Sequence, residues 1–255
     1  MNLIKYLVLI LLIAYLVAGT VLVVFQRDFI YYPTRAISLA GISDVELFHE
    51  DIRLAGHVAN DGRNSLILYF GGNAEQIAHA VQDLSQRFPG FTVVGFHYRG
   101  YSGSAGEPRE QELYGDALYV FDKLVNSYDR TIVIGRSLGS GVATYLASER
   151  EVDSLVLVTP FDSITSIAKN AYWFYPVDWM IRDKFNSLSR AEKIQSPTLL
   201  LVAEKDQIVP PVHSQKLLNG FAPGVAKIAT IKGTSHNTIS EHGDYFAELQ
   251  NFIVK

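Results

Sequence analysis

A serine between two glycines forms the most informative motif in this sequence. The motif Gly-Arg-Ser-Leu-Gly occupies 135–139, directly after an apolar run at 131–134 and at the start of a stretch with helical spacing at 139–150. A serine on such a sharp strand-to-helix turn exposes its hydroxyl for nucleophilic attack. A side chain at either glycine would collide with the neighbouring strand or helix. The motif therefore predicts that Ser137 is a nucleophile, and its alternative is a glycine-rich turn with an idle serine.

The base for this serine is predicted to be His236, held by Asp206. A serine hydroxyl is a weak nucleophile unless a base accepts its proton, and that base must be kept in one tautomer. Asp206 follows an apolar run at 198–202, and His236 follows the next such run at 227–231. The carboxyl ends of parallel strands meet at one edge of a sheet, where catalytic groups gather. We therefore expect Ser137, Asp206 and His236 to converge.

Other carboxylates and histidines are weaker candidates for these roles. Asp162 follows the run at 154–158 and Glu204 lies just before Asp206, but neither fits a loop after a strand as well as Asp206 does. The remaining histidines precede the acid, lie away from the strand ends or fall beside the last helix. Surface or core roles are expected for them: His49, His57, His79, His97, His213 and His242.

The oxyanion of an acyl-transfer reaction needs backbone N–H donors. One is expected from Leu138, the residue after the nucleophile. The other is expected from Asn73, in the turn Gly-Gly-Asn-Ala at 71–74 that follows the apolar run at 65–70. The glycines let this backbone bend towards the serine. A helix N-cap at Asn73 is compatible with the same role.

The elements that must hold these residues form a repeated rhythm of strand and helix. Short apolar runs rich in β-branched residues predict the strands of a parallel sheet covered on both faces, at 65–70, 92–97, 131–134, 154–158, 198–202 and 227–231. Stretches with helical spacing lie at 74–88, 110–128, 139–150 and 211–218. Residues 47–59 predict one or two antiparallel edge strands. The fold class is therefore α/β, with a mostly parallel, doubly wound sheet.

One segment, at about 161–196, interrupts this rhythm. It is too long for a simple link and too short for a separate domain. Its aromatic residues cluster in the middle and include Trp173 and Trp179. We expect a short helical cap insertion over the top of the sheet. It could act as a lid that contacts substrate or be a surface helix packed through its aromatics, and the sequence favours neither.

Residues 6–25 are an uncharged run of the length that an α-helix needs to cross a bilayer. A cleaved signal peptide would have a shorter apolar region and small residues at the cut, where Leu16 stands instead. A buried core helix is the other alternative. We predict an N-terminal membrane anchor over 1–28 and a catalytic domain over 29–255.

Composition narrows the possible functions. The net charge of −4 provides no basic surface for nucleic acid, so no nucleic-acid partner is expected. The absence of cysteine from the sequence excludes disulfides, thiol catalysis and cysteine-ligated zinc. No pair of histidines at helical spacing and no acidic cluster suggests a metal site. Neither a metal nor another cofactor is predicted.

The order of these motifs resembles the α/β-hydrolase superfamily over nearly the whole chain. The resemblance rests on the stretches at 71–74, 98–108, 135–141, 206–210 and 233–236. The anchor followed by Ile-Tyr-Tyr-Pro-Thr is similar to the single-pass, membrane-bound hydrolases of the abhydrolase-domain type. The phenylalanine before the first oxyanion glycine departs from the pattern, because the family often has histidine there. That departure affects a local contact.

The resemblance implies an α/β-hydrolase fold with a triad of Ser137, Asp206 and His236. It also implies that Asn73 and Leu138 form the oxyanion hole. We expect hydrolysis of an ester or thioester of a small or lipid-like acyl substrate through a Ser137 acyl-enzyme. The superfamily includes lysophospholipases, depalmitoylases, esterases and peptidases, so a serine peptidase and a non-catalytic binding protein of the same fold are the alternatives.

The side of the membrane follows from the charges that flank the anchor. Lys5 and the amino terminus lie before the apolar run, whereas Arg27 and Arg35 lie after it. The bias of positive charge across the membrane is therefore close to nil. An uncleaved anchor ahead of a large domain commonly acts as an export signal. We expect a single-pass membrane protein with its hydrolase domain on the extracytoplasmic side.

Overall fold

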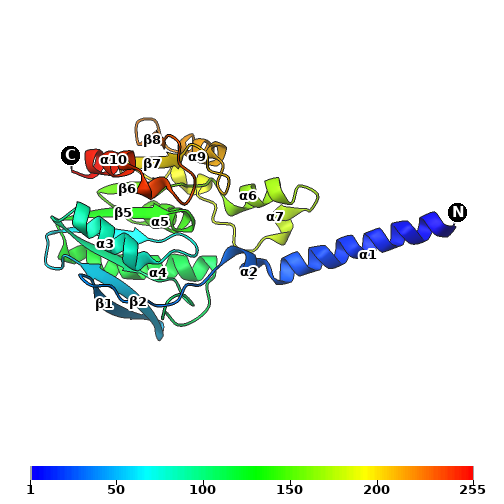
Figure 1. Cartoon of the computed structure of the whole chain (residues 1–255), viewed down its shortest axis with the longest axis horizontal. Helices are drawn as coiled ribbons and strands as arrows, with labels where there is room; N and C mark the ends of the chain where they lie inside the picture. The colour runs from blue at the N-terminus through cyan, green and yellow to red at the C-terminus, as the bar shows by residue number, and fades with distance from the viewer. Residues whose placement is uncertain (1, 255) are drawn as a thin grey trace.

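An eight-stranded sheet forms the centre of the molecule, with strand order β1-β2-β4-β3-β5-β6-β7-β8 (Figure 1). The computed structural model describes residues 2–254. β1 pairs with β2, and β2 with β4, in antiparallel fashion, and the later neighbours pair in parallel. The strands are β1 Ser43–His49, β2 Ile52–Ala59, β3 Ser65–Phe70, β4 Phe91–Phe96, β5 Arg130–Arg136, β6 Ser154–Val158, β7 Thr198–Ala203 and β8 Ala226–Ile231. The predicted mostly parallel sheet and its antiparallel edge are confirmed.

Helices cover both faces of this sheet. One face carries α3 Ile77–Arg87 and α10 Gly243–Ile253. The other face carries α4 Glu110–Leu124, α5 Leu138–Glu149, α8 Leu188–Ala191 and α9 Pro211–Leu218. Two short 3₁₀ turns, η1 Val125–Ser127 and η2 Ile239–Glu241, complete the connections. A doubly wound α/β domain is the result.

Strand β3 shows why the central strands are apolar throughout. Leu66, Leu68 and Phe70 point into one hydrophobic cluster, whereas Ile67 and Tyr69 point into the cluster on the opposite face. All five side chains are buried. Successive strand residues face opposite sides, so a strand between two helical layers must be apolar at each position.

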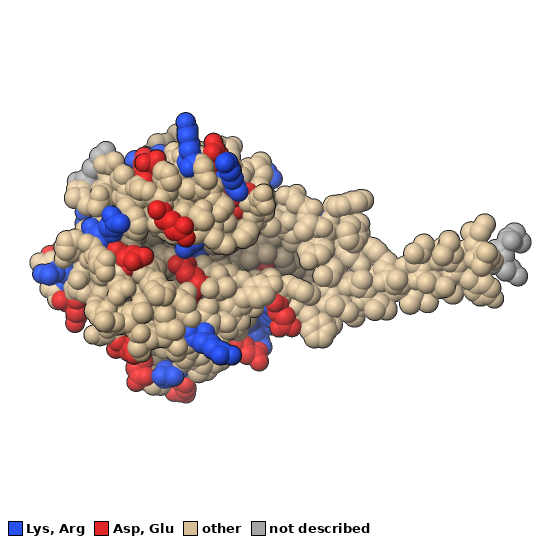
Figure 2. All heavy atoms as spheres, viewed as in Figure 1, with Lys and Arg blue, Asp and Glu red and all other residues tan. Residues whose placement is uncertain are grey.

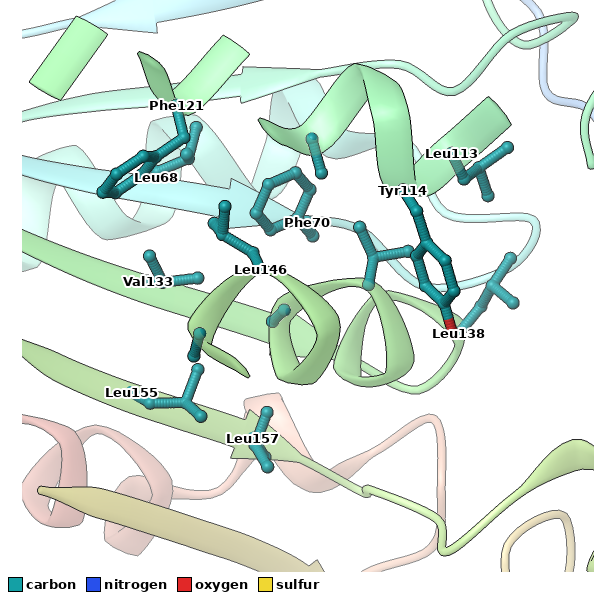
Figure 3. Packing of buried hydrophobic residues seen from close by; sticks show 14 of the residues in the cluster. Leu68, Phe70, Leu113, Tyr114, Phe121, Val133, Leu138, Leu146, Leu155 and Leu157 are labelled. Atoms are coloured by element: carbon teal, nitrogen blue, oxygen red, sulfur yellow. The ribbon is translucent and has the colours of Figure 1, made fainter. Parts of the chain in front are cut away.

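The first cluster also fixes the start of α5. Leu146 of α5 packs among Phe70 of β3 and Val133 of β5, and Leu138 lies in the same cluster near Tyr114 (Figure 3). Burial of each such side chain stabilises the fold by about 1.5–3 kcal/mol. The residue that follows Ser137 is therefore held by the core of the domain.

The helix α3 begins later than the sequence suggests. Residues 74–76 were expected in the helix, but α3 starts at Ile77 with Gln76 as its N-cap. Ala74 has a φ of 57°, in the left-handed region, which an α-helix cannot contain. The Glu75 carboxylate accepts a hydrogen bond from the Gly72 amide and closes a turn there instead. The local turn thus displaces the first helical turn.

The helix α1, Asn2–Val24, projects away from the domain (Figure 1). Its segment Leu3–Val24 has a mean hydropathy of 3.0 and is long and apolar enough to cross a membrane. In the view of Figure 2 its surface shows neither Lys and Arg nor Asp and Glu, and these colour the body of the domain. The short helix α2, Gln26–Ile30, links it to the sheet. The division at residue 28 into anchor and domain stays a prediction.

The insertion between β6 and β7 is helical and lies against α1 and α2. It contains α6 Ile164–Ala171 and α7 Val177–Met180, followed by α8. We refer to residues 161–196 as the cap. Tyr175 of the cap stacks on Tyr15 of α1 with ring centroids 4.5 Å apart. Trp173 and Trp179 are 80% and 91% exposed, so these two rings pack against neither the sheet nor α1.

Candidate active site

Ser137 sits on a strained turn between β5 and α5. Its backbone has φ 48° and ψ −115°, a conformation that costs on the order of 1–3 kcal/mol for a residue other than glycine. A Cβ added to Gly139 would overlap the carbonyl oxygen of Phe70, and one added to Gly135 would overlap that of Gly139. Both glycines are required because helix and strand backbones approach so closely. The surrounding structure thereby maintains the strained serine.

The structure brings the three predicted side chains into one hydrogen-bonded series. His236 Nε2 lies 2.9 Å from Ser137 Oγ, and His236 Nδ1 lies 2.7 Å from Asp206 Oδ2. The second oxygen of Asp206 accepts hydrogen bonds from the amides of Ile208 and Val209, at 2.9 and 2.8 Å. With its carboxylate held at both oxygens, Asp206 fixes the proton of His236 on Nδ1. Nε2 is then free to accept the proton of the serine.

The alternative acids have other partners. Asp162 Oδ1 lies 2.7 Å from Nδ1 of His213, which is a fully buried histidine. Nε2 of His213 lies 3.1 Å from the side-chain nitrogen Nδ2 of Asn170 in the cap. Glu204 accepts a hydrogen bond of 2.8 Å from the Gly233 amide, at the start of the loop that carries His236. The choice of Asp206 over both is therefore consistent with the geometry.

The turn at 71–74 closes one side of the serine. A Cβ built on Gly72 would lie 3.5 Å from Cβ of Ser137, so this backbone passes directly beside the nucleophile. Within residues 2–254, the amides of Asn73 and Leu138 donate no hydrogen bond. Two amides without partners beside a serine hydroxyl are the type of donor that an oxyanion requires.

The Asn73 side chain does not cap a helix. Its Oδ1 accepts hydrogen bonds of 2.8 Å from the Tyr32 amide and the Tyr101 hydroxyl, and its Nδ2 donates to the Ile30 carbonyl at 2.7 Å. The alternative of an N-cap at Asn73 is not what the structure shows, because α3 begins at Ile77 and Gln76 holds the cap position. The Asn73 side chain instead connects the turn at 71–74 to the segment that leads out of α2.

A partly buried ion pair that was not predicted from the sequence connects the three loops of the site. Glu75 Oε1 lies 3.5 Å from Nη1 of Arg136, while its other oxygen holds the Gly72 amide. Arg136 Nη2 donates to the carbonyl oxygens of His236 and Asn237, at 3.3 and 3.4 Å. Although desolvation lowers it, the pKa of Arg136 is raised by the Glu75 carboxylate. The signal in the sequence was an arginine in the variable position of the serine motif, at the end of an apolar strand.

No metal-binding cluster is seen in the part of the chain that the structure describes. Groups of three or more His, Asp or Glu side chains placed to hold an ion do not occur between residues 2 and 254. What the site can do chemically is proton transfer from a serine through a fixed histidine, beside two available amides. That is the set of groups needed for acyl transfer.

Comparisons with known proteins indicate the family and the fold of the chain. The sequence model for the alpha/beta hydrolase fold matches residues 69–180. The uncharacterized protein MT2364 of Mycobacterium tuberculosis is 30% identical over 227 residues, which are 83% of this chain and 80% of that protein. The mouse lysophosphatidylserine lipase ABHD12 is 36% identical over 203 residues, which are 70% of this chain. The chain matches about half, 49%, of that lipase.

A solved structure shows the same fold. The esterase Pf2001 of Pyrococcus furiosus superposes with a TM-score of 0.70, over 88% of this chain and 98% of the esterase. The two sequences are 18% identical, so the likeness concerns the fold.

Proposed function

The chain belongs to the α/β-hydrolase family of hydrolytic enzymes, and on this premise we propose that it cleaves an ester or thioester of a lipid-like acyl substrate through a Ser137 acyl-enzyme. The observation that carries the proposal is the series from Asp206 through His236 to Ser137, with distances of 2.7 and 2.9 Å. It supports a nucleophile, a general base and an acid that orients the base.

In the acylation step, Ser137 Oγ attacks the carbonyl carbon of the substrate while His236 Nε2 accepts the hydroxyl proton. The carbonyl oxygen becomes negatively charged and receives hydrogen bonds from the amides of Asn73 and Leu138. The bond to the leaving group then breaks, and the proton on Nε2 passes to the departing oxygen or sulfur. Asp206 stabilises the imidazolium that forms between these events.

Deacylation repeats the same movements with water. His236 Nε2 accepts a proton as the water oxygen attacks the acyl carbon, and a second oxyanion forms at the same two amides. When this intermediate collapses, the proton returns to Ser137 Oγ and the carboxylic acid is released. The free enzyme is regenerated, and water is the second reactant.

The substrate class and the location belong to the same proposal. The curated relatives that are named lysophosphatidylserine lipases act on an acyl lipid, and the chain carries an apolar helix of membrane-spanning length. Both favour a lysophospholipid-like acyl ester over a peptide bond. We place the protein in a membrane through α1, with the hydrolase domain on the extracytoplasmic side.

A serine-directed fluorophosphonate tests the nucleophile. We expect labelling of the unchanged protein and of Ser148→Ala, a control on the same helix α5, and no labelling of Ser137→Ala. Ester turnover should fall by about 10³ or more in both Ser137→Ala and His236→Ala, because triad members act as a unit. Labelling that persists in Ser137→Ala would overturn the assignment, provided thermal unfolding shows that the variants are folded.

A further inference from the structure

An apolar cavity lies where the end of α1 meets the cap. Its volume is about 240 Å³. Leu22, Phe29 and Ile30 line it from the side of α1 and α2, and Ile167, Ala168 and Met180 line it from the cap. An apolar cavity of about 150 Å³ inside a protein is already large enough to bind benzene. The cavity therefore has room for part of an acyl chain.

The one side-chain amide in the described lining of this cavity is already engaged. Gln26 lines the wall, but its Nε2 donates to the carbonyl oxygens of Val23 and Met180, at 2.8 and 3.2 Å. Its Oε1 accepts from the Arg182 amide at 2.7 Å. A polar occupant would find no partner in that amide, whereas a hydrocarbon chain needs none.

One wall of the cavity is hydrogen-bonded to a residue of the proposed oxyanion hole. The carbonyl oxygen of Ile30, a lining residue, accepts the hydrogen bond of 2.7 Å from Nδ2 of Asn73. Ile30 and Ile167 pack against the same hydrophobic cluster that contains Leu138. Asn73, one of the two residues whose amides are proposed to hold the oxyanion, is thus a neighbour of the cavity wall.

The outer end reaches along the membrane-spanning helix. Tyr175 of the cap stacks on Tyr15, and the hydroxyl of Tyr15 donates to the Phe174 carbonyl at 2.8 Å. Tyr15 lies about 14 Å before the end of α1, at 1.5 Å per helical residue. If α1 crosses a bilayer, the tip of the cap lies within it. Exposed tryptophans such as Trp173 and Trp179 are typical of the lipid–water interface.

We propose that this cavity binds the acyl chain of a lipid substrate, which enters from the bilayer beside α1 with its ester bond directed to Ser137. The inference rests on the function proposed above and adds the site of the acyl chain and the phase from which it comes. The membrane-spanning helix would then be part of the substrate site as well as an anchor. Chain-length preference would be set by contacts between α1, α2 and the cap.

Filling the cavity tests this proposal in the full-length protein. Ala168→Trp places a large ring between α6 and α2, and Ala171→Phe is a second variant that also fills the cavity. The measurement is kcat/KM in detergent micelles for p-nitrophenyl palmitate and p-nitrophenyl butyrate. We expect palmitate hydrolysis to fall about tenfold or more, since the methylenes that are excluded from the cavity lose their burial. Butyrate hydrolysis should stay within about twofold, because a short chain does not need the cavity.

The matched control is Lys169→Trp, which adds the same ring on the exposed side of α6 and should change neither rate. If the two cavity-filling variants hydrolyse both esters at the rates of the unchanged protein, the acyl-chain site is overturned while the assignment as a serine hydrolase stands. A parallel fall on both esters, with unchanged labelling of Ser137 by a small fluorophosphonate, would also overturn it. Failure of the unchanged protein to hydrolyse any ester would instead refute the proposed function.

Discussion

Two buried histidine–carboxylate pairs have their carboxylates in the connections that follow β6 and β7. His236 pairs with Asp206 and His213 with Asp162, each at 2.7 Å, but only His236 also contacts the serine. Both carboxylates follow a strand, so the sequence favours Asp206 but keeps Asp162 as an alternative acid. What separates them is the partner: His213 is on α9 and turns its second nitrogen to the cap, away from Ser137.

We predict that Asp206→Asn leaves the fold intact and lowers turnover by about 10⁴, the size of the effect in the serine-protease precedent, because the amide favours the wrong tautomer of the histidine. Asp162→Asn is the matched control, with the same chemical change at a buried histidine. It should change the melting temperature while kcat stays within a few-fold. Ester kinetics and thermal unfolding of both variants decide the matter, and the reverse pattern would mean that the acid is Asp162.

A third buried histidine makes the stability of the fold depend on pH. Burial, with a smaller effect of His57 whose Nε2 is 3.1 Å away, lowers the pKa of His97 to about 4 from 6.5. The folded state holds His97 neutral, so between pH 6.5 and 4 the unfolded state binds more protons. The free energy of unfolding should therefore fall as the pH falls through this window, by at most about 3 kcal/mol.

Denaturant unfolding at several pH values checks this expectation. His97→Gln removes the titrating group and should give a flatter dependence of the unfolding free energy on pH between 6.5 and 4. His79→Gln, at an exposed histidine on α3, should retain the slope of the unchanged protein. Parallel curves for all three proteins would show that His97 does not contribute.

At the scale of elements, the turn between β5 and α5 depends on the absence of a side chain. We predict that Gly139→Ala destabilises the protein by several kcal/mol or prevents folding, because its Cβ would overlap the carbonyl oxygen of Phe70 in the neighbouring strand. Gly90→Ala is the control, since its Cβ would meet no atom within 4 Å. The melting temperatures of the two variants should differ clearly. Equal stability would mean that the elbow can open without cost.

The elements that could be predicted best from the sequence are the strands that are buried on both faces of the sheet. Strands buried on both faces must be apolar at each position, so β3 and β6 were predicted with their observed bounds, Ser65–Phe70 and Ser154–Val158. The start of α3 was wrong because a carboxylate three residues beyond Gly72 captures its amide. Such a contact depends on the three-dimensional position of Glu75 and leaves no periodic signal.

The convergence of the three candidate site residues could be predicted from their positions after strands. Ser137, Asp206 and His236 each follow a strand, and the topology of a parallel sheet brings strand ends together without knowledge of side-chain contacts. The pair of Arg136 and Glu75 was missed because it joins loops that are far apart in sequence. Its function in holding the loops comes from hydrogen bonds to backbone groups, which residue type alone does not reveal.

At the scale of the whole molecule, the segment that follows α1 is bound to the cap. Arg27, just after α1, pairs with Asp183 of the cap at 3.0 Å, and the Tyr31 hydroxyl donates to the same carboxylate at 3.2 Å. The hydrogen bond to Asp183 raises the pKa of Arg27. One positive charge on the domain side of the helix is therefore neutralised within the protein.

We predict that the protein stays in the membrane through an alkaline carbonate wash, because insertion of an apolar helix of this length into a bilayer is effectively irreversible. Protease added to intact cells or spheroplasts should then digest the hydrolase domain, since we place it outside. A cytoplasmic protein must survive in the same sample as a control for intact membranes. If the hydrolase domain survives while an external control is digested, the domain faces the cytoplasm and the topology is reversed. If carbonate releases a protein that lacks its first residues, α1 is a cleaved signal, and the acyl-chain site that it lines loses one of its walls.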